Sequence, residues 1–214
     1  MKRFIWGLAA GILLLIVCST LKMERGLSPT HKKFYDHVWL IMETRVPKDI
    51  DPKQPYERVY FLKLTPEQKD KYIKLFWEMR EVDAEKEYQF RTELATKAFR
   101  GEGIDGEKTD RGFILLLCGQ PDYLECVDQN GDYYNAGEEE WGYAEQAERR
   151  WFQKWIYWYG QGFFRQLVPV WFEYDKTRTW HYIPSTDSQQ KSFIDYCRWR
   201  LGPTPEGWDL WRKQ

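Results

Sequence analysis

The run Thr109-Asp110-Arg111-Gly112 carries the residue types in this chain that are most typical of a functional motif. If Asp110 and Arg111 are exposed, they offer an anion and a cation beside Gly112, a residue that lets a ligand approach the backbone. The run equally suits a junction between a loop and a strand. There Asp110 would accept hydrogen bonds from loop N–H groups, Arg111 would pair with a carboxylate, and Gly112 would open the strand. We favour this structural interpretation, because Asp and Gly at such a junction need no ligand.

The other residues able to do catalytic chemistry show no catalytic spacing. His31 and His37 lie six positions apart on one expected helix, which differs from the i, i+4 spacing of a metal-binding pair. We expect these two histidines and His181 at the surface. The sequence contains no signature of the GxSxG, HExxH, Walker or Rossmann type. We therefore expect no enzyme activity, no cofactor and no metal site.

Four cysteines are present, and Cys18 belongs to the N-terminal segment. The other three, Cys118, Cys126 and Cys197, can form at most one intramolecular disulfide. Cys126 could pair with Cys118 or with Cys197, or the thiols could stay free and buried. A structural zinc site is not expected, because the sequence has no CxxC pair and no Cys/His cluster.

Aromatic residues make up 18% of the chain, with 12 Trp, 14 Tyr and 12 Phe. The simpler interpretation is a core and sheet surface built from large rings, because aromatic residues favour strands. The alternative is a stacking platform for sugars or peptide, and its candidate ligand-facing residues are Trp155, Trp158, Trp171 and Trp180.

Alternation along a strand separates these rings into two sets. Trp155, Tyr157 and Tyr159 would share one face of a strand, and Ile156 and Trp158 the other. An exposed and coplanar set would support glycan binding, whereas burial of both sets would exclude it.

The charge balance bears on the class of ligand. Lys and Arg total 32 and Asp and Glu total 33, so the net charge is −1. A nucleic-acid-binding protein would show a basic surplus on one face, so we exclude nucleic acid as a partner.

The N-terminus of this 214-residue chain has the pattern of an export signal. Lys2 and Arg3 precede an apolar run of 14 residues, Phe4 to Val17, which is the length of a signal-peptide core and is short for a membrane span. Because the positive charges come first, we expect residues 22–214 outside the cytoplasm. The location expected is the periplasmic side of the cell envelope.

Three fates of residues 1–21 stay open. Leu15-Ile16-Val17-Cys18 is similar to a bacterial lipobox, in which Cys18 is acylated. An ordinary cleavage after Ser19 is the second fate, and an uncleaved membrane anchor is the third. The first and third predict a protein tethered to a membrane by its N-terminus.

Periodicity and capping patterns predict five helices. Thr65, followed by Pro66 and Gln68, forms a capping box. Asp83 can begin the next helix, with Phe90, Leu94 and Ala98 on its apolar side, and the short link predicts a helical hairpin. The predicted helices run from Ser28 to about Arg45, from Thr65 past Met79, from Asp83 to about Phe99, over the weaker stretch Glu138 to Gln153, and from Asp187 to Leu201.

Apolar and aromatic runs predict the strands. They cover Phe113–Cys118, its hairpin partner Tyr123–Val127, Trp155–Tyr159, Leu167–Tyr174 and Thr179–Ile183, while Val59–Leu62 is strand or irregular. Pro169 suits an edge or a bulge. This order predicts an α+β fold: a helical hairpin packed on an antiparallel, aromatic-rich β-sheet, with an extra N-terminal helix and a C-terminal helix. We expect a signal or anchor (1–21), an N-terminal helix and linker (22–55), the α+β domain (56–201) and a tail (202–214), whose Trp208 and Trp211 fold back.

The stretch from Glu57 to about Ile183 resembles the GWxTD domain family of exported bacterial proteins. The similar blocks are Leu62 to Glu67 with Tyr72 to Trp77, Arg80-Glu81, Tyr88 to Arg91, Gly106 to Gly112, Gly119-Gln120-Pro121-Asp122, and Trp155 to Tyr159. Within the fourth block, Gly106, Thr109 and Asp110 match the eponymous motif, but Glu107 replaces its Trp. The resemblance implies a divergent member, with the envelope location and fold type of that family.

Together these patterns predict an exported, membrane-tethered cell-envelope protein with a non-catalytic protein-interaction domain. Its partners would be cell-envelope proteins, bound through an edge strand of the sheet or through the N-terminal helix. The alternative is a glycan- or peptidoglycan-binding module that uses exposed aromatic side chains.

Overall fold

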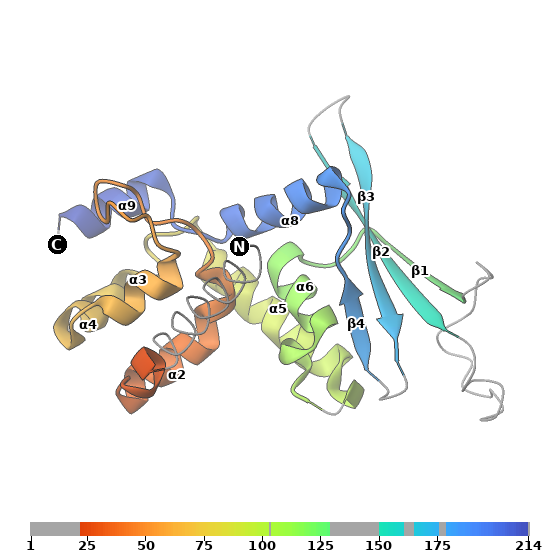
Figure 1. Ribbon diagram of the computed structural model, residues 1–214, viewed down its shortest axis with the longest axis horizontal. Coiled ribbons are helices and arrows are strands. Elements are labelled where there is room, and N and C mark those ends of the chain that lie inside the picture. Colours follow the sequence, from red (N-terminus) through yellow and green to blue (C-terminus); the bar gives the residue numbers. More distant parts are fainter. Residues whose placement is uncertain (1–21, 103, 129–149, 161–164, 176–178, 214) are drawn as a thin grey trace, which may run out of the picture. The chain divides into compact units, whose positions relative to one another are not determined.

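The chain divides into two compact units, which are described separately here (Figure 1). The computed structural model describes residues 22–102, 104–128, 150–160, 165–175 and 179–213. The first unit comprises Met1–Val82 and Leu201–Gln214, and the second comprises Asp83–Arg200. The division between the two units falls at Val82 and again at Leu201.

The expected signal region, with Cys18, lies outside the described residues, as does the weak helix over residues 138–149. In the part of the chain that is described, no helix is both long and apolar enough to cross a bilayer.

The first unit is built from short helices, and three of those described begin at side-chain caps. Ser28, Thr65 and Thr204 each accept a hydrogen bond from a backbone N–H three residues later, and a proline follows each cap. The predicted capping box at Thr65 is confirmed. The elements are α2 (Pro29–Val38), η1 (Trp39–Ile41), α3 (Glu57–Lys63), α4 (Pro66–Leu75) and α9 (Pro205–Arg212).

Aromatic rings fill the core of the first unit. The rings of Tyr72 and Phe76 are fully buried, and the Trp211 ring packs edge-on against Tyr72 with centroids 5.3 Å apart. Trp211 also donates a hydrogen bond from Nε1 to the Tyr60 hydroxyl, at 3.0 Å. The prediction that Trp208 and Trp211 fold back is confirmed, because α9 carries both and Trp208 is buried.

Two predictions for the first unit are wrong. Val59–Leu62 belongs to helix α3, because a short apolar run does not distinguish a strand from a buried helix. His31 is buried, and its Nε2 lies 2.9 Å from Asp70 Oδ1. The carboxylate on α4 gives the imidazole a polar partner, so burial leaves no unpaired group there.

The second unit confirms the predicted α+β class with an antiparallel sheet. Its strands lie in sequence order β1-β2-β3-β4, and helices cover one face of the sheet (Figure 1). The elements are α5 (Ala84–Ala98), η2 (Arg100–Glu102), η3 (Gly106–Lys108), α6 (Asp110–Cys118), β1 (Tyr123–Asp128), β2 (Trp151–Tyr159), β3 (Gln166–Tyr174), β4 (Trp180–Ile183) and α8 (Ser188–Arg200).

Strand register assigns the side chains to two faces. On the face toward the helices, Trp155 and Tyr157 of β2 lie opposite Val170 and Val168 of β3, and all four are buried. On the outer face, Trp158 pairs with Leu167, and both are exposed. Pro169 lies beyond the end of β4, whose pairing with β3 starts at Trp171. Its missing N–H therefore removes no bond to that strand.

The apolar run Phe113–Cys118 is helix α6 and not the predicted strand. The Thr109 cap begins a helix there, and Gly119, at φ +79°, ends it. The run is apolar on nearly every side because α6 is almost entirely buried. As a consequence, β1 pairs with β2 and not with residues 113–118.

Two smaller expectations for the second unit also fail. Trp151–Gln153, expected at the end of a helix, begins strand β2. On α5 the buried side carries Tyr88 and Ala95, whereas Phe90 is exposed. Helix α5 packs with α6 of the same unit, whereas α4, the other helix of the expected hairpin, belongs to the first unit.

Candidate functional site

The predicted motif residues gather where α6 begins. The Thr109 hydroxyl accepts a hydrogen bond from the Gly112 N–H at 2.9 Å and donates one to the Gly106 carbonyl at 2.8 Å. A Cβ on Gly112 would lie 2.0 Å from the Gly106 carbonyl oxygen, and a Cβ on Gly106 would lie 2.2 Å from that of Ala95. Both glycines therefore allow α5, η3 and α6 to approach with backbone in contact.

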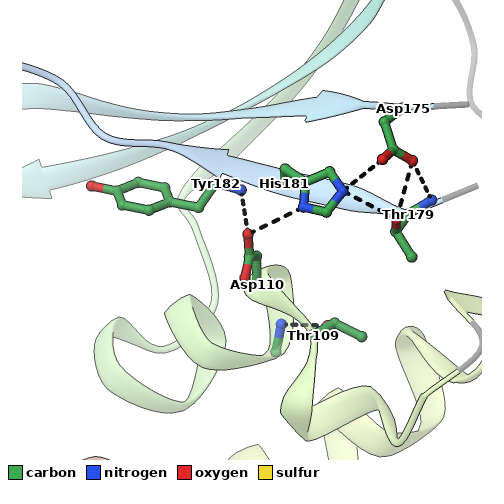
Figure 2. Close-up of polar contacts among 7 residues, drawn as sticks. Thr109, Asp110, Asp175, Thr179, His181 and Tyr182 are labelled. Carbon is green, nitrogen blue, oxygen red and sulfur yellow. Dashed lines mark hydrogen bonds and ion pairs between the residues drawn. The ribbon is translucent and has the colours of Figure 1, made fainter. Parts of the chain in front are cut away.

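Asp110 joins α6 to the sheet, as Figure 2 shows. Its Oδ2 accepts a hydrogen bond from the Tyr182 backbone N–H of β4 at 2.8 Å. The same oxygen lies 3.8 Å from His181 Nδ1. Because β4 is the last strand of the sheet, this carboxylate caps a backbone donor on that edge.

The His181 side chain lies on the outer face of the sheet, between the carboxylates of Asp110 and Asp175. Its Nε2 is 2.8 Å from Asp175 Oδ2 and 3.2 Å from the Thr179 hydroxyl (Figure 2). The Thr179 N–H also donates to Asp175, at 3.3 Å. These contacts hold together the two ends of the connection from β3 to β4. Within the described residues, no group of three or more His, Cys, Asp or Glu side chains could hold a metal ion.

Arg111 lies on the helix-facing side of the sheet. Its guanidinium donates to Gln153 Oε1 at 3.1 Å and lies over the rings of Phe99 and Trp180, 4.6 and 5.0 Å from their centroids. The Trp155 indole N–H donates to the same Gln153 oxygen at 2.8 Å. Arg111 therefore connects α6 with the C-terminal end of α5 and with strands β2 and β4.

The Gly119-Gln120-Pro121-Asp122 block forms the connection from α6 to β1. Gly119 has a left-handed φ, and Arg91 Nη2 would lie 3.3 Å from a Cβ placed there. Asp122 accepts a hydrogen bond from the Trp158 N–H at 2.8 Å, and its own N–H donates to the Ile156 carbonyl at 2.9 Å. Pro121 lies between these anchored residues, so the block fixes the entry of the chain into the sheet.

The four candidate aromatic residues do not form one platform. Trp155 and Trp180 lie on the helix-facing side, and Trp155 is 2% exposed. Trp171 and Trp158 lie on the outer face, where the Lys154 amino group is 5.4 Å from the centroid of the Trp171 ring. Of the four, Trp158 alone is largely exposed, at 44%.

The two edges of the sheet differ in a way that motif reasoning missed. The β4 edge receives Asp110, whereas β1 has no further strand beside it among the described residues. Tyr123 and Leu124 of β1 are 55% and 52% exposed, and register places them on opposite faces. The alternation of apolar and polar residues after Asp122 indicates a strand. Only the order of the strands in the sheet shows that this strand lies at an edge.

No family model matches the chain, and comparison with curated proteins and with solved structures gave no match either. The resemblance to the GWxTD family stays a prediction from sequence. The site therefore rests on its own geometry: a motif that contacts the sheet, and the edge strand β1, which has only β2 beside it among the described residues.

Proposed function

We propose that the chain is a non-catalytic binding domain of the cell envelope that takes up an extended segment of a partner protein along strand β1. The observation that carries this proposal is the contrast between the edges. Asp110 caps a backbone donor of β4, whereas β1 pairs with β2 on one side and has no other strand beside it among the described residues.

The unpaired backbone groups of an edge strand favour an extended peptide as the ligand. Alternate N–H and C=O groups of an edge strand point away from the sheet and are satisfied best by another extended backbone. Tyr123 and Leu124 add exposed apolar surface on the two faces of the same strand. Affinity would come from main-chain hydrogen bonds, and specificity from side-chain contacts with Tyr123 and Leu124.

Glycan binding is the weaker alternative. It calls for several exposed rings in one plane, yet Trp155 and Tyr157 are buried on one face of β2, and Ile156 is buried on the other. Trp158 is left as an isolated exposed ring on that strand. An extended peptide uses the β1 edge without requiring a row of rings.

The location belongs to the proposal as well. Lys2 and Arg3 followed by the apolar run to Val17 support export, and Cys18 supports attachment through an acyl chain. Cys18→Ala should release the chain from membranes if acylation is the tether. Retention of Cys18→Ala in the membrane fraction would favour the uncleaved anchor, and a cytosolic chain would overturn the envelope location.

The binding proposal is tested by capture from detergent-solubilised membranes with the full-length chain as bait. Leu124→Lys places a charge on the open edge and should lose the captured partner. Phe90→Lys is the matched control, because Phe90 is also exposed, at 56%, and lies on helix α5 of the same unit. We expect the wild type and Phe90→Lys to capture the same protein.

Backbone hydrogen exchange then locates the contact. Addition of the captured partner should slow exchange of the β1 amides and leave those of β4 unchanged. Capture that survives Leu124→Lys, or retention of glycan without protein, would contradict an edge-strand interaction.

A further inference from the structure

Exposed apolar side chains gather where strand β1 begins. On the outer face of the sheet, Tyr123 of β1 pairs with Ile156, two residues before Trp158 on β2, and both Tyr123 and Trp158 are exposed. On the helix-facing side, Leu124 is exposed beside the buried Trp155. The first two residues of β1 therefore present apolar surface on both faces of the sheet.

The next outward-facing residue of β1 is charged. Glu125 Oε2 accepts a hydrogen bond from Lys154 Nζ of β2 at 2.9 Å, and both side chains are partly exposed. Because β2 pairs with only one side of β1, an added strand would approach the Glu125 carboxylate from the side opposite Lys154. A cation on that strand, directly opposite Glu125, would be attracted to it.

The charges of β1 also bear on whether the occupant is a second copy of this chain. The strand has the sequence YLECVD, with two carboxylates and no Lys or Arg. Two β1 strands side by side would bring Glu125 and Asp128 of each copy together without a cation from either strand, and like charges destabilise paired strands. The edge is therefore complementary to a basic segment of another protein.

Strand geometry sets the order of residues in such a segment. Side chains at alternate positions share a face, so the residues opposite Tyr123 and Glu125 lie on the outer face, and the residue between them lies on the side of Leu124. Every pairing in the described sheet is antiparallel, and antiparallel pairing is slightly more stable per residue than parallel pairing. From its N-terminus, an antiparallel segment meets Glu125 first, then Leu124 and then Tyr123.

We propose that the segment bound at β1 carries a basic residue followed directly by two large apolar residues. The basic residue lies opposite Glu125, the first apolar residue opposite Leu124, and the second opposite Tyr123. The two apolar side chains remove exposed surface of β1 from water on both faces of the sheet. This assignment rests on the proposed function, because it requires an added strand at β1.

The probe is a library of short random peptides displayed on phage and selected on the purified full-length chain. We expect the enriched peptides to contain Lys or Arg followed by two residues from the set Leu, Ile, Val, Phe, Tyr and Trp. One enriched peptide is then labelled, and its affinity is measured by fluorescence anisotropy. When bound, it should slow amide hydrogen exchange over residues 123–128.

Reversal of the ion pair between Glu125 and Lys154 tests the charge. The double variant Glu125→Lys with Lys154→Glu keeps a cross-strand pair but changes the sign of the charge on β1. It should bind the selected peptide about tenfold more weakly, and it should prefer a peptide with Glu in place of the basic residue. The matched control, Glu173→Arg with Arg150→Glu, reverses an ion pair on β3, which is not next to β1, and should change neither affinity.

Tyr123→Ser tests the apolar contact. It removes the ring opposite the last residue of the bound motif and should weaken binding by about tenfold. Leu167→Ser is the matched control, because Leu167 is also exposed on the outer face, at 46%, but lies on β3. We expect its affinity for the selected peptide to equal that of the wild type.

The outcomes separate this inference from the proposed function. Peptides that slow exchange in β1 but lack the order basic, apolar, apolar would overturn the inference, as would a charge reversal that leaves the preference unchanged. In both cases β1 would stand as a peptide-binding edge. Selection that yields no peptide able to slow exchange of the β1 amides would contradict both the inference and uptake of a segment at β1.

Discussion

At the scale of single residues, a buried ion pair in the first unit connects helix α3, the C-terminal end of helix α4 and the chain at Leu201. Arg80 Nη2 lies 2.6 Å from Glu57 Oε1, and both side chains are fully buried. Arg80 also donates to the Phe76 and Leu201 carbonyls, at 2.7 and 2.9 Å, and the Tyr72 hydroxyl donates to Glu57. Because every charge in the cluster has a partner, removal of one member should cost more than the pair itself contributes.

Arg80→Met should therefore destabilise the first unit by about 3–5 kcal/mol, because it leaves the Glu57 carboxylate buried without its cation. The free energy of unfolding is measured in urea by circular dichroism. The double variant Arg80→Met with Glu57→Gln should recover part of the loss, since it removes the unpaired charge.

The matched control is an exposed ion pair in the same unit. Arg212 Nε lies 2.6 Å from Asp49 Oδ2, at the surface. Water screens such pairs, so Asp49→Asn should leave the urea midpoint nearly unchanged. Equal effects of Arg80→Met and Asp49→Asn would contradict the importance of the buried cluster.

Tyr72 gives the same cluster a pH dependence. Burial, and next the negative charge of Glu57, raise the pKa of its hydroxyl well above the ordinary 10.0. Above about pH 10 the unfolded chain loses this proton while the folded chain keeps it, so stability falls as pH rises, by up to about 1.4 kcal/mol per pH unit. Tyr72→Phe should remove that contribution to the slope, measured by urea unfolding on both sides of pH 10. Parallel stability curves for the wild type and the variant would contradict the assignment.

At the scale of elements, the sequence predicted those with a local chemical signal and missed those decided by packing. The Thr65 box and the aromatic strands were predictable because capping and alternation are local. Helix α6 was not, because its six apolar residues suit a buried strand equally well. That error also assigned β1 the wrong partner.

The candidate site was predictable in composition but not in orientation. Spacing drew attention to Thr109, Asp110 and Arg111. It could not show that the Arg111 side chain lies on the helix-facing side of the sheet, or that Asp110 accepts a hydrogen bond from β4. Those contacts join residues far apart in the sequence. The open edge at β1 likewise depends on strand order, which short-range patterns do not encode.

The contact between η3 and α5 gives an element-scale prediction. An added methyl on Gly106 would lie 2.2 Å from the Ala95 carbonyl oxygen and 2.9 Å from Thr96 Cα, and backbone cannot rotate aside as a side chain can. Gly106→Ala should therefore cost about 3 kcal/mol in the free energy of unfolding of the second unit.

Gly101→Ala is the matched control, because a Cβ at Gly101 would meet nothing within 4 Å. We expect a change of less than about 1 kcal/mol in either direction. The two variants are compared by thermal and urea unfolding, and a Gly106→Ala protein as stable as Gly101→Ala would show that η3 can shift.

At the scale of the whole molecule, the sequence of the second unit lies between the two chain segments that make up the first. The first unit needs both of its chain segments: the Thr204 N–H donates to the Met79 carbonyl at 2.8 Å, and a Cβ on Gly207 would lie 1.9 Å from the same oxygen. The second unit is one continuous segment with its own core, Asp83–Arg200. The units should therefore respond differently to truncation.

A chain that ends at Arg200 should keep the second unit folded and lose the first. Without residues 201–214, the rings of Tyr72 and Tyr60 lose Trp211, and Arg80 loses the Leu201 carbonyl. Because such a loss exposes a core filled with aromatic rings, the helices α3 and α4 should not persist. Amide hydrogen exchange followed by mass spectrometry reports the two units separately. We expect fast exchange over residues 57–75 and protection retained over 151–159 and 166–174.

The contiguous fragment 83–200 is a second test of the autonomy of the second unit, because it lacks every residue of the first unit. Its exchange pattern over the strands should match that of the chain ending at Arg200, since the same sheet and helices enclose the same buried rings. If strands β2 and β3 lose protection in either protein, the second unit depends on the first for its fold, and the binding edge at β1 could not be assigned to an autonomous domain.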